Sequence, residues 1–199
     1  MKIYILRHED RTKDCSFFSP LTEKGLIKSN KLIKILKSHN INLVFSSPFI
    51  RTLQTIHPYL KATGNKVNIE YGLSEIQHSS IIAPKTFGVI LPEYMEKHYN
   101  YNSEYKSFIS HDGMKYPEET LDCYNRTKRM FKHIIEEYYK TDLNILLVTH
   151  QGICTSILRF INDSSPKYKN KLNQEIKEYK KGQLSLIFDI CDWKFEKLN

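Results

Sequence analysis

The stretch of sequence that decides the fold is KIYILRHED, residues 2–10. Its first half is an apolar run rich in β-branched and aromatic residues, which is typical of a buried strand. The run ends at Arg7 and His8, and two acidic residues follow. A buried strand that ends on a cation and an imidazole either reaches the surface there or delivers both side chains to a site.

Predicted strands and helices alternate along the rest of the chain. We predict strands in 41–47, 66–70 and 143–149, helices in 22–39, 48–63, 117–140 and 150–161, and an antiparallel hairpin in 183–198. Apolar strands that alternate with helices predict an α/β fold, a three-layer α/β/α sandwich with a mostly parallel central sheet. Thr22 is the expected N-cap of the first helix, Pro48 is expected in the first turn of the second, and Leu26 and Leu121 are expected on apolar helix faces.

The chain length and one irregular segment set the expected domain organisation. A chain of 199 residues fits one domain of ordinary size, so we expect a single domain over residues 1–199. From about 77 to 115 the periodicity disappears, and His, Tyr, Pro, Ser and Lys crowd together. A segment of this length inside a compact domain is usually functional, so we expect an insertion that covers the substrate.

The charge of the chain favours anionic partners. The formal net charge is +8, which suits phosphorylated metabolites or nucleic acid, although a lysine-rich solvated surface gives the same value. Residues 166–182 carry six lysines and interleaved tyrosines, but they also carry Glu175 and Glu178, contain no arginine and match no binding motif. We therefore expect this run to be solvated surface and do not expect nucleic acid as a partner.

Cysteine use and hydropathy indicate an intracellular protein. The four cysteines, at 15, 123, 154 and 191, form no CxxC pair, so neither a zinc ribbon nor a redox dithiol is indicated. We expect free, buried thiols in a reducing compartment, and no metal or cofactor. No apolar run approaches the roughly 20 residues that a membrane helix needs, so a cytoplasmic location is expected and a membrane is not.

Histidines follow two of the predicted strands. Arg7 and His8 follow the first strand, and His150 follows the strand that ends at Thr149. Ligands of open α/β sheets bind outside the carboxyl ends of the strands, so these side chains are expected to converge there.

At this point the sequence resembles the histidine phosphatase superfamily, the phosphoglycerate mutase-like proteins, over nearly the whole chain. The matching segments, in the order of the superfamily's motifs, are LRHED (6–10), LTEKG (21–25), VFSSPFIRTLQT (44–55), GLSEI (72–76), EETLDCYNR (118–126) and LLVTHQG (146–152). The resemblance implies a phosphoglycerate mutase-like fold.

The resemblance also implies a phosphate pocket with a histidine nucleophile. His8 takes the position of the nucleophile, which needs an unprotonated nitrogen in line with phosphorus. Arg7 and Arg51 match the pocket arginines, whose planar forks contact two phosphoryl oxygens and whose charge is expected to lower the pKa of His8. His150 is expected to be a further catalytic donor to the same oxygens.

Glu75 matches the glutamate of the superfamily's Leu-x-Glu motif and is the expected general acid and base. A leaving alkoxide needs a proton, and an attacking water must lose one. The acid phosphatases and phytases of the superfamily take this proton donor from an Asp directly after the second histidine, where this chain has Gln151. On this criterion the chain resembles the mutase-like branch.

Two residues near the nucleophile depart from the pattern. Glu9 stands where the signature has Gly, and it either points along the loop, pairs with a cation, or points inward and weakens substrate binding. Arg11 falls where the acid phosphatases have a second pocket arginine, so it is either a further phosphate-binding cation or an exposed loop residue.

The sequence therefore predicts a metal-independent phosphomonoester hydrolase that acts on a small phosphorylated molecule through a phosphohistidine. Phosphoglycerate mutase-type phosphoryl transfer and a weak or inactive protein that binds a phosphate ligand are the alternatives, and Glu9 is the feature that favours the latter. The physiological substrate and homodimer formation stay open.

Overall fold

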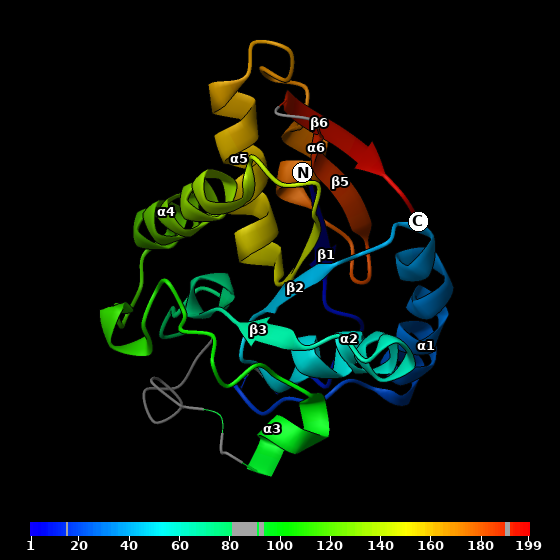
Figure 1. The fold of residues 1–199 in the computed structure, drawn as a ribbon. Coiled ribbons are helices and arrows are strands. Elements are labelled where there is room, and N and C mark those ends of the chain that lie inside the picture. The colour runs from blue at the N-terminus through cyan, green and yellow to red at the C-terminus, as the bar shows by residue number, and fades with distance from the viewer. Residues whose placement is uncertain (15, 81–90, 92–93, 190–191) are drawn as a thin grey trace.

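A six-stranded sheet forms the centre of the protein (Figure 1). The computed structural model describes residues 1–14, 16–80, 91, 94–189 and 192–199. The strands are β1 (Lys2–Arg7), β2 (Leu43–Ser46), β3 (Val67–Ile69), β4 (Asn144–Thr149), β5 (Leu184–Asp189) and β6 (Asp192–Lys197). Their order is β3-β2-β4-β1-β5-β6, with the first four parallel and β5 and β6 antiparallel. The predicted parallel sheet and C-terminal hairpin are confirmed.

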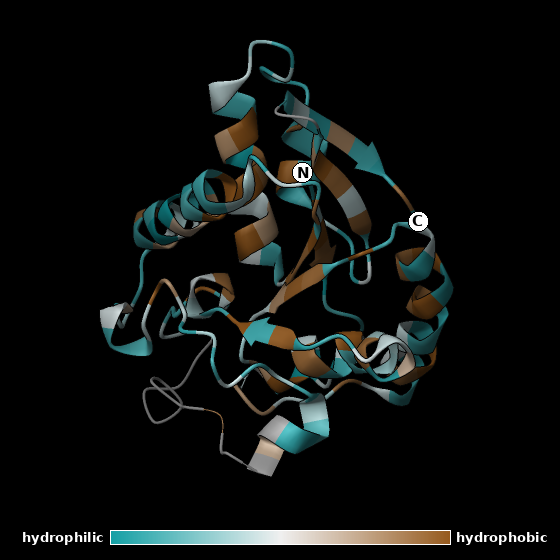
Figure 2. Ribbon diagram, viewed as in Figure 1, coloured by the Kyte–Doolittle hydropathy of each residue, from teal (hydrophilic) through white to brown (hydrophobic). Residues whose placement is uncertain are grey.

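Helices cover both faces of this sheet (Figure 1). They are α1 (Glu23–Ser38), α2 (Ile50–Thr63), α3 (Tyr94–Tyr99), α4 (Thr120–Tyr138), α5 (Gln151–Ser164) and α6 (Asn173–Lys177). Side chains of β1 alternate between the faces: Ile3 and Ile5 pack in the core with α4 and α5, and Tyr4 and Leu6 in the core with α1 and α2. The inward faces are brown in Figure 2, and the three-layer α/β/α architecture is confirmed.

The predictions that Leu26 and Leu121 lie on buried helix faces are wrong, and so is the prediction that Pro48 lies in the first turn of the second helix. Leu121 is 67% exposed and Leu26 is 43% exposed, although both helices form where expected. The buried face of α4 includes Cys123, Arg126 and Met130, and an arginine on a buried face shifts the apparent apolar stripe. Pro48 lies before α2, which begins at Ile50, whereas Thr22 caps α1 as predicted by accepting a hydrogen bond from the Gly25 amide.

The two cysteines that the structure describes are free and buried, as expected. Cys123 and Cys154 are buried free thiols, and burial raises the pKa of Cys123 to about 11. The predictions for Cys15 and Cys191 lie outside the described residues. Among the described helices, none combines the length and the apolar character needed to cross a membrane.

A buried carboxylate attaches the irregular segment to the sheet. Glu70 follows β3 and is 0% exposed. Its Oε1 accepts hydrogen bonds from the amides of Gly72 and Ile109 at 2.8 and 3.1 Å, and its Oε2 accepts from the Tyr105 hydroxyl and the Phe108 amide at 2.7 and 2.8 Å. A buried carboxylate is tolerated only when it is hydrogen-bonded, so these donors both stabilise Glu70 and hold residues 105–109 against β3.

Short helical elements occur within the segment expected to be an insertion. The described residues there form α3 and a 3-10 turn at His111–Gly113. Residues 81–90 and 92–93 of that segment lie outside the described part of the chain. The backbone at Asn100 and Asn102 pairs with Val67, so residues 100–102 lie along β3.

Glu70→Ala is expected to lower the free energy of unfolding by about 3 kcal/mol, because it leaves buried donors without their acceptor. Urea unfolding followed by circular dichroism measures the change. Glu104→Ala, which removes an exposed glutamate of the same segment, is the matched control and is expected to change stability by less than about 0.5 kcal/mol. Equal effects for the two variants would contradict the anchoring role of Glu70.

Candidate active site

The pairing of β1 with β4 brings the two strand-end histidines together. The parallel register places Arg7 opposite Thr149, and the amide of His8 donates to the Thr149 carbonyl at 2.9 Å. The rings of His8 and His150, one residue further on each chain segment, lie edge to face with centroids 5.2 Å apart. The predicted convergence of Arg7, His8 and His150 at the carboxyl edge of the sheet is therefore present.

The hydrogen bond of His8 determines which ring nitrogen carries the proton. Nδ1 lies 2.7 Å from the carbonyl oxygen of Glu9, and a carbonyl can only accept, so Nδ1 is the protonated nitrogen. Thr55 holds the main chain of the same residue by accepting a hydrogen bond from the Glu9 amide at 3.0 Å. Burial, followed by the positive charge of Arg51, lowers the pKa of His8 well below its usual value. His8 is therefore neutral, with a lone pair on Nε2.

His150 is fully buried beside His8. Its Nε2 lies 2.8 Å from the hydroxyl of Ser47, and that hydroxyl also accepts a hydrogen bond from the Phe49 amide at 3.4 Å. Burial, with the charge of Arg51 second, lowers the pKa of His150 well below its usual value. The Ser47 hydroxyl can donate to an unprotonated Nε2 or accept from a protonated one, and Nδ1 of His150 has no hydrogen-bond partner among the described residues.

A pocket of about 250 Å³ lies in front of His8. Its lining residues are Arg7, His8, Arg11, Thr12, Lys13, Glu75 and Lys181. The structure thus brings together the predicted nucleophile, the predicted acid and two predicted cations. The sequence predicted no role in the site for Thr12 or Lys13, and it placed Lys181 on a solvated surface.

Arg51 and His150 are buried and are not among the residues that line this pocket. Arg51 is 2% exposed, its Nη1 donates to the Ser16 carbonyl at 2.9 Å, and its guanidinium lies 4.5 Å from the centroid of the Phe49 ring. The positive charge of Arg51 nevertheless contributes, after burial, to the lowered pKa of both histidines. Direct contact of Arg51 and His150 with a phosphoryl group stays a prediction.

Gln151 holds the side chain of Arg7. Nη1 of Arg7 donates to Gln151 Oε1 at 2.8 Å and to the Tyr179 carbonyl at 2.5 Å. Gln151 Nε2 in turn donates to the Thr155 hydroxyl at 3.1 Å. An amide at this position has no acidic proton to give, so Gln151 positions Arg7, and Glu75 is the carboxyl group that lines the pocket.

The carboxylate of Glu75 lies at the N-terminus of α5. Its Oε1 accepts hydrogen bonds from the amides of Gly152 and Ile76 at 3.2 and 3.0 Å. These two amides hold the carboxyl group of Glu75 in place beside the pocket. A Cβ at Gly152 would lie only 2.6 Å from Oε1, so the approach of Glu75 requires glycine there.

A buried ion pair that the sequence analysis missed fixes the segment before Glu75. Arg126 of α4 donates to both carboxylate oxygens of Glu118, at 2.7 and 2.8 Å, and to the carbonyls of Gly72 and Ser74 at 2.7 and 3.1 Å. Both side chains are almost fully buried. The only sequence signal was their presence at the two ends of the segment EETLDCYNR.

The side chain of Glu9 lies outside the pocket in front of His8. It is 4% exposed and packs against Gly182, where a Cβ would collide with its carboxylate. It lines a separate cavity of about 340 Å³ with Lys28 and Lys31. Of the orientations left open by the sequence, the structure has the one in which Glu9 points away from the pocket in front of His8.

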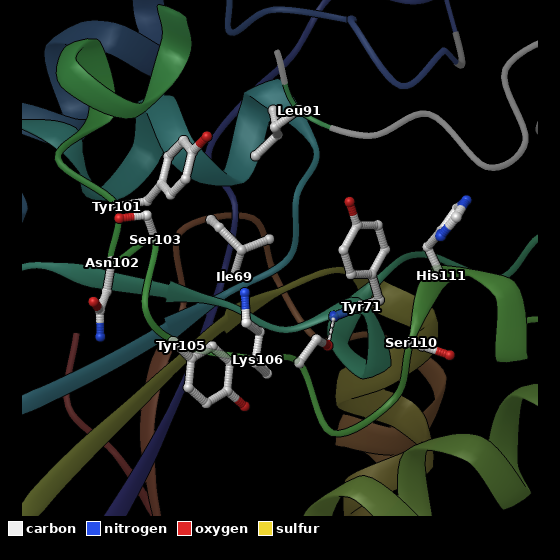
Figure 3. Close-up of a pocket in the computed structure, with 11 residues that line it drawn as sticks. Ile69, Tyr71, Leu91, Tyr101, Asn102, Ser103, Tyr105, Lys106, Ser110 and His111 are labelled. Carbon is white, nitrogen blue, oxygen red and sulfur yellow. Dashed lines mark hydrogen bonds between the residues drawn. The ribbon is translucent and has the colours of Figure 1, made fainter. Parts of the chain in front are cut away.

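A larger cavity, of about 440 Å³, lies between β3 and the irregular segment (Figure 3). Tyr71, Tyr101 and His111 surround it, and none of the predicted catalytic residues lines it. Across the described residues there is no group of three or more His, Cys, Asp or Glu side chains that suits a metal ion.

The imidazole signals of His8 and His150 are expected to show no titration midpoint near pH 6.5, because burial and nearby arginines keep both rings neutral. The measurement is an NMR titration of histidine Cε1 resonances from pH 7.5 to pH 5, with signals assigned from His8→Asn and His150→Asn. Arg51→Met is expected to move both midpoints to higher pH. An ordinary midpoint for either ring in the wild type would contradict this electrostatic description.

Solved structures similar to this chain include several phosphatases. An ecdysone phosphate phosphatase from Bombyx mori, in complex with tungstate, has a TM-score of 0.68 and 14% identity, covering 98% of this chain and 95% of that chain. A mycobacterial glucosyl-3-phosphoglycerate phosphatase has a TM-score of 0.65 and 14% identity, with coverages of 98% and 97%. The α-ribazole phosphatase of Shigella flexneri has a TM-score of 0.64 and 17% identity, with coverages of 94% and 90%. At these identities the likeness shows the fold.

No curated protein matches the chain by sequence. The family model of the histidine phosphatase superfamily, branch 1, matches residues 11–185, which is most of the chain. With this match and the phosphoglycerate mutase-like fold, the chain belongs to the histidine phosphatase superfamily.

Proposed function

We propose that this protein hydrolyses phosphomonoesters through a covalent phosphohistidine formed on His8. The observation that carries the proposal is the hydrogen bond from His8 Nδ1 to the Glu9 carbonyl, which leaves Nε2 as the nucleophilic nitrogen. His8 lines a pocket with Arg7, Arg11 and Glu75, which supply the positive charge and the proton that phosphoryl transfer needs.

In the first step Nε2 of His8 attacks phosphorus, the N–P bond forms and the P–O bond to the alcohol breaks. Arg7 and Arg11 stabilise the charge on the phosphoryl oxygens, and Arg51 adds positive charge from behind. The proposal gives His150 the tautomer in which Ser47 donates to Nε2, so that its Nδ1 proton is an additional donor to these oxygens. Protonated Glu75 transfers its proton to the leaving oxygen.

In the second step water attacks the phosphohistidine. Glu75, now a carboxylate, accepts a proton from the water as the new O–P bond forms and the N–P bond breaks. The products are inorganic phosphate and neutral His8. The lowered pKa of His8 supports this cycle, because an imidazole that stays neutral is available as a nucleophile at each turnover.

Hydrolysis is preferred over a mutase reaction. The similar structures named above are phosphatases, and the described pocket is lined by exposed as well as buried residues, so water has access to it. The proposal includes metal independence, because the arginines of the chain supply the positive charge that the phosphoryl group requires. A single domain over residues 1–199 with an insertion at about 77–115, and a cytoplasmic location, are part of the same proposal.

A phosphate-binding protein without turnover is the alternative, and the position of Glu9 argues against it. A carboxylate that points into the pocket would repel the substrate, whereas Glu9 packs against Gly182 and its main chain orients His8. The extra acid next to the nucleophile is thus compatible with catalysis.

The wild type is expected to hydrolyse 4-nitrophenyl phosphate in the presence of EDTA, and His8→Ala is expected to lower kcat by at least about 10³-fold, because no other group replaces the nucleophile. Steady-state kinetics with released nitrophenol as the readout measures this. His133→Ala, which removes a histidine on α4, is the matched control and is expected to keep the wild-type rate. Binding of vanadate without turnover in the wild type would favour the alternative.

A further inference from the structure

Lys181 lies in the wall of the catalytic pocket, although its sequence context indicated only a solvated surface. It lines the pocket together with His8 and Glu75. Its side chain is 45% exposed, and its Nζ forms an ion pair with Asp10 Oδ1 at 2.5 Å. Asp10 itself accepts a hydrogen bond from the Thr22 hydroxyl at 3.0 Å, so the acid is fixed by α1 and the lysine is the more exposed partner.

The main chain holds the loop of Lys181 directly on the strand end that carries the nucleophile. The amide of Gly182 donates to the carbonyls of Arg7 and His8 at 3.0 and 3.2 Å, and the amide of Arg7 donates to the Gln183 carbonyl at 3.2 Å. Gly182 has φ +71°, in the left-handed region that favours glycine, and the Glu9 carboxylate packs against it. The position of Lys181 beside His8 is therefore built into the fold.

The pocket is lined by two cationic side chains beyond the two arginines proposed to bind the phosphoryl group. The lining has four cationic side chains, Arg7, Arg11, Lys13 and Lys181, and Glu75 is the one carboxylate among its described lining residues. Arg7 and Arg11 provide two planar forks for the phosphoryl oxygens. Lys13 and Lys181 are more exposed than the two arginines, so they lie where the pocket lining meets solvent.

We propose that the substrate is a phosphomonoester whose alcohol carries a second anionic group, and that Lys181 binds that group with support from Lys13. The proposal rests on the proposed phosphatase function and specifies its substrate class. A carboxylate and a second phosphate share the required chemistry. The anionic group replaces Asp10 as the partner of Lys181, and because Asp10 stays bonded to Thr22, the exchange needs only a movement of the lysine side chain.

The test compares substrates that differ in the second anion. Phosphoglycolate carries a carboxylate, propane-1,3-diol bisphosphate carries a second phosphate, and ethyl phosphate carries neither. The wild type is expected to prefer one or both anionic substrates over ethyl phosphate in kcat/KM. Lys181→Met is expected to lower that preference about tenfold, mainly through KM, because it removes one charge-assisted hydrogen bond. The anionic substrate whose kcat/KM falls more in Lys181→Met identifies whether the second anion is a carboxylate or a phosphate.

Two further variants separate recognition from a structural effect. Lys180→Ala removes the adjacent lysine, which does not line the catalytic pocket, and is expected to keep the wild-type preference. Asp10→Asn removes the competing carboxylate and is expected to raise the preference two- to threefold. If Lys181 had only a structural role, Lys181→Met would change kcat/KM equally for all three substrates.

Equilibrium binding to His8→Ala protein, measured by calorimetry with the same compounds, keeps the proposal testable without turnover. In the His8→Ala background, the anionic compounds are expected to have a lower Kd than ethyl phosphate, and Lys181→Met is expected to reduce this difference. An unchanged preference in Lys181→Met overturns the second-anion site and leaves the phosphatase function intact. Absence of turnover in the wild type, with the preference retained in Kd, overturns the phosphatase function and supports the binding site.

Discussion

The parallel pairing of β1 with β4 is the constraint on which the candidate site depends. It places Arg7 opposite Thr149, so His8 and His150 follow adjacent strands at the same sheet edge. The two cores fix this register, because a slip of one residue would turn Ile3 and Ile5 toward α1 and α2 and Tyr4 and Leu6 toward α4 and α5. The free energy of apolar burial therefore also maintains the contact between the histidine rings.

Polar side chains then fix the parts of the site that the sheet does not carry. Gln151, which is partly buried, holds Arg7, the buried pair of Glu118 and Arg126 holds the segment before Glu75, and Glu70 holds residues 105–109 against β3. Burial of a charge is costly unless it has partners, and Arg126 and Glu70 find theirs partly among main-chain groups of the segments that must be positioned. The desolvation cost is offset by contacts that also preorganise the pocket.

The sequence predicted the fold and the meeting of Arg7, His8 and His150 at one edge of the sheet, because both depend on local patterns. Apolar segments predicted the strands of the sheet, and His8, Glu75 and His150 lie at strand ends or in short sequence motifs. Lys181 and Arg126 were missed because their roles depend on contacts between distant segments, to Asp10 and to Ser74, that no local pattern records. Leu121 was misplaced for a related reason: the ion pair of Arg126 permits a charged residue on the buried face of α4. The orientation of Glu9 depends on the absence of a side chain at Gly182, more than 170 positions away.

The central claim, covalent transfer of the phosphoryl group to His8, is tested most directly by trapping the intermediate. In Glu75→Gln the second step lacks its general base, while 4-nitrophenolate leaves readily without a proton donor, so phosphoenzyme is expected to accumulate. Rapid quench in alkali followed by peptide mass spectrometry is the measurement. The account predicts an added phosphoryl group on the peptide that contains His8 and none in the double variant His8→Ala, Glu75→Gln. A phosphoryl group on another residue, or turnover with no covalent intermediate at any quench time, would contradict it.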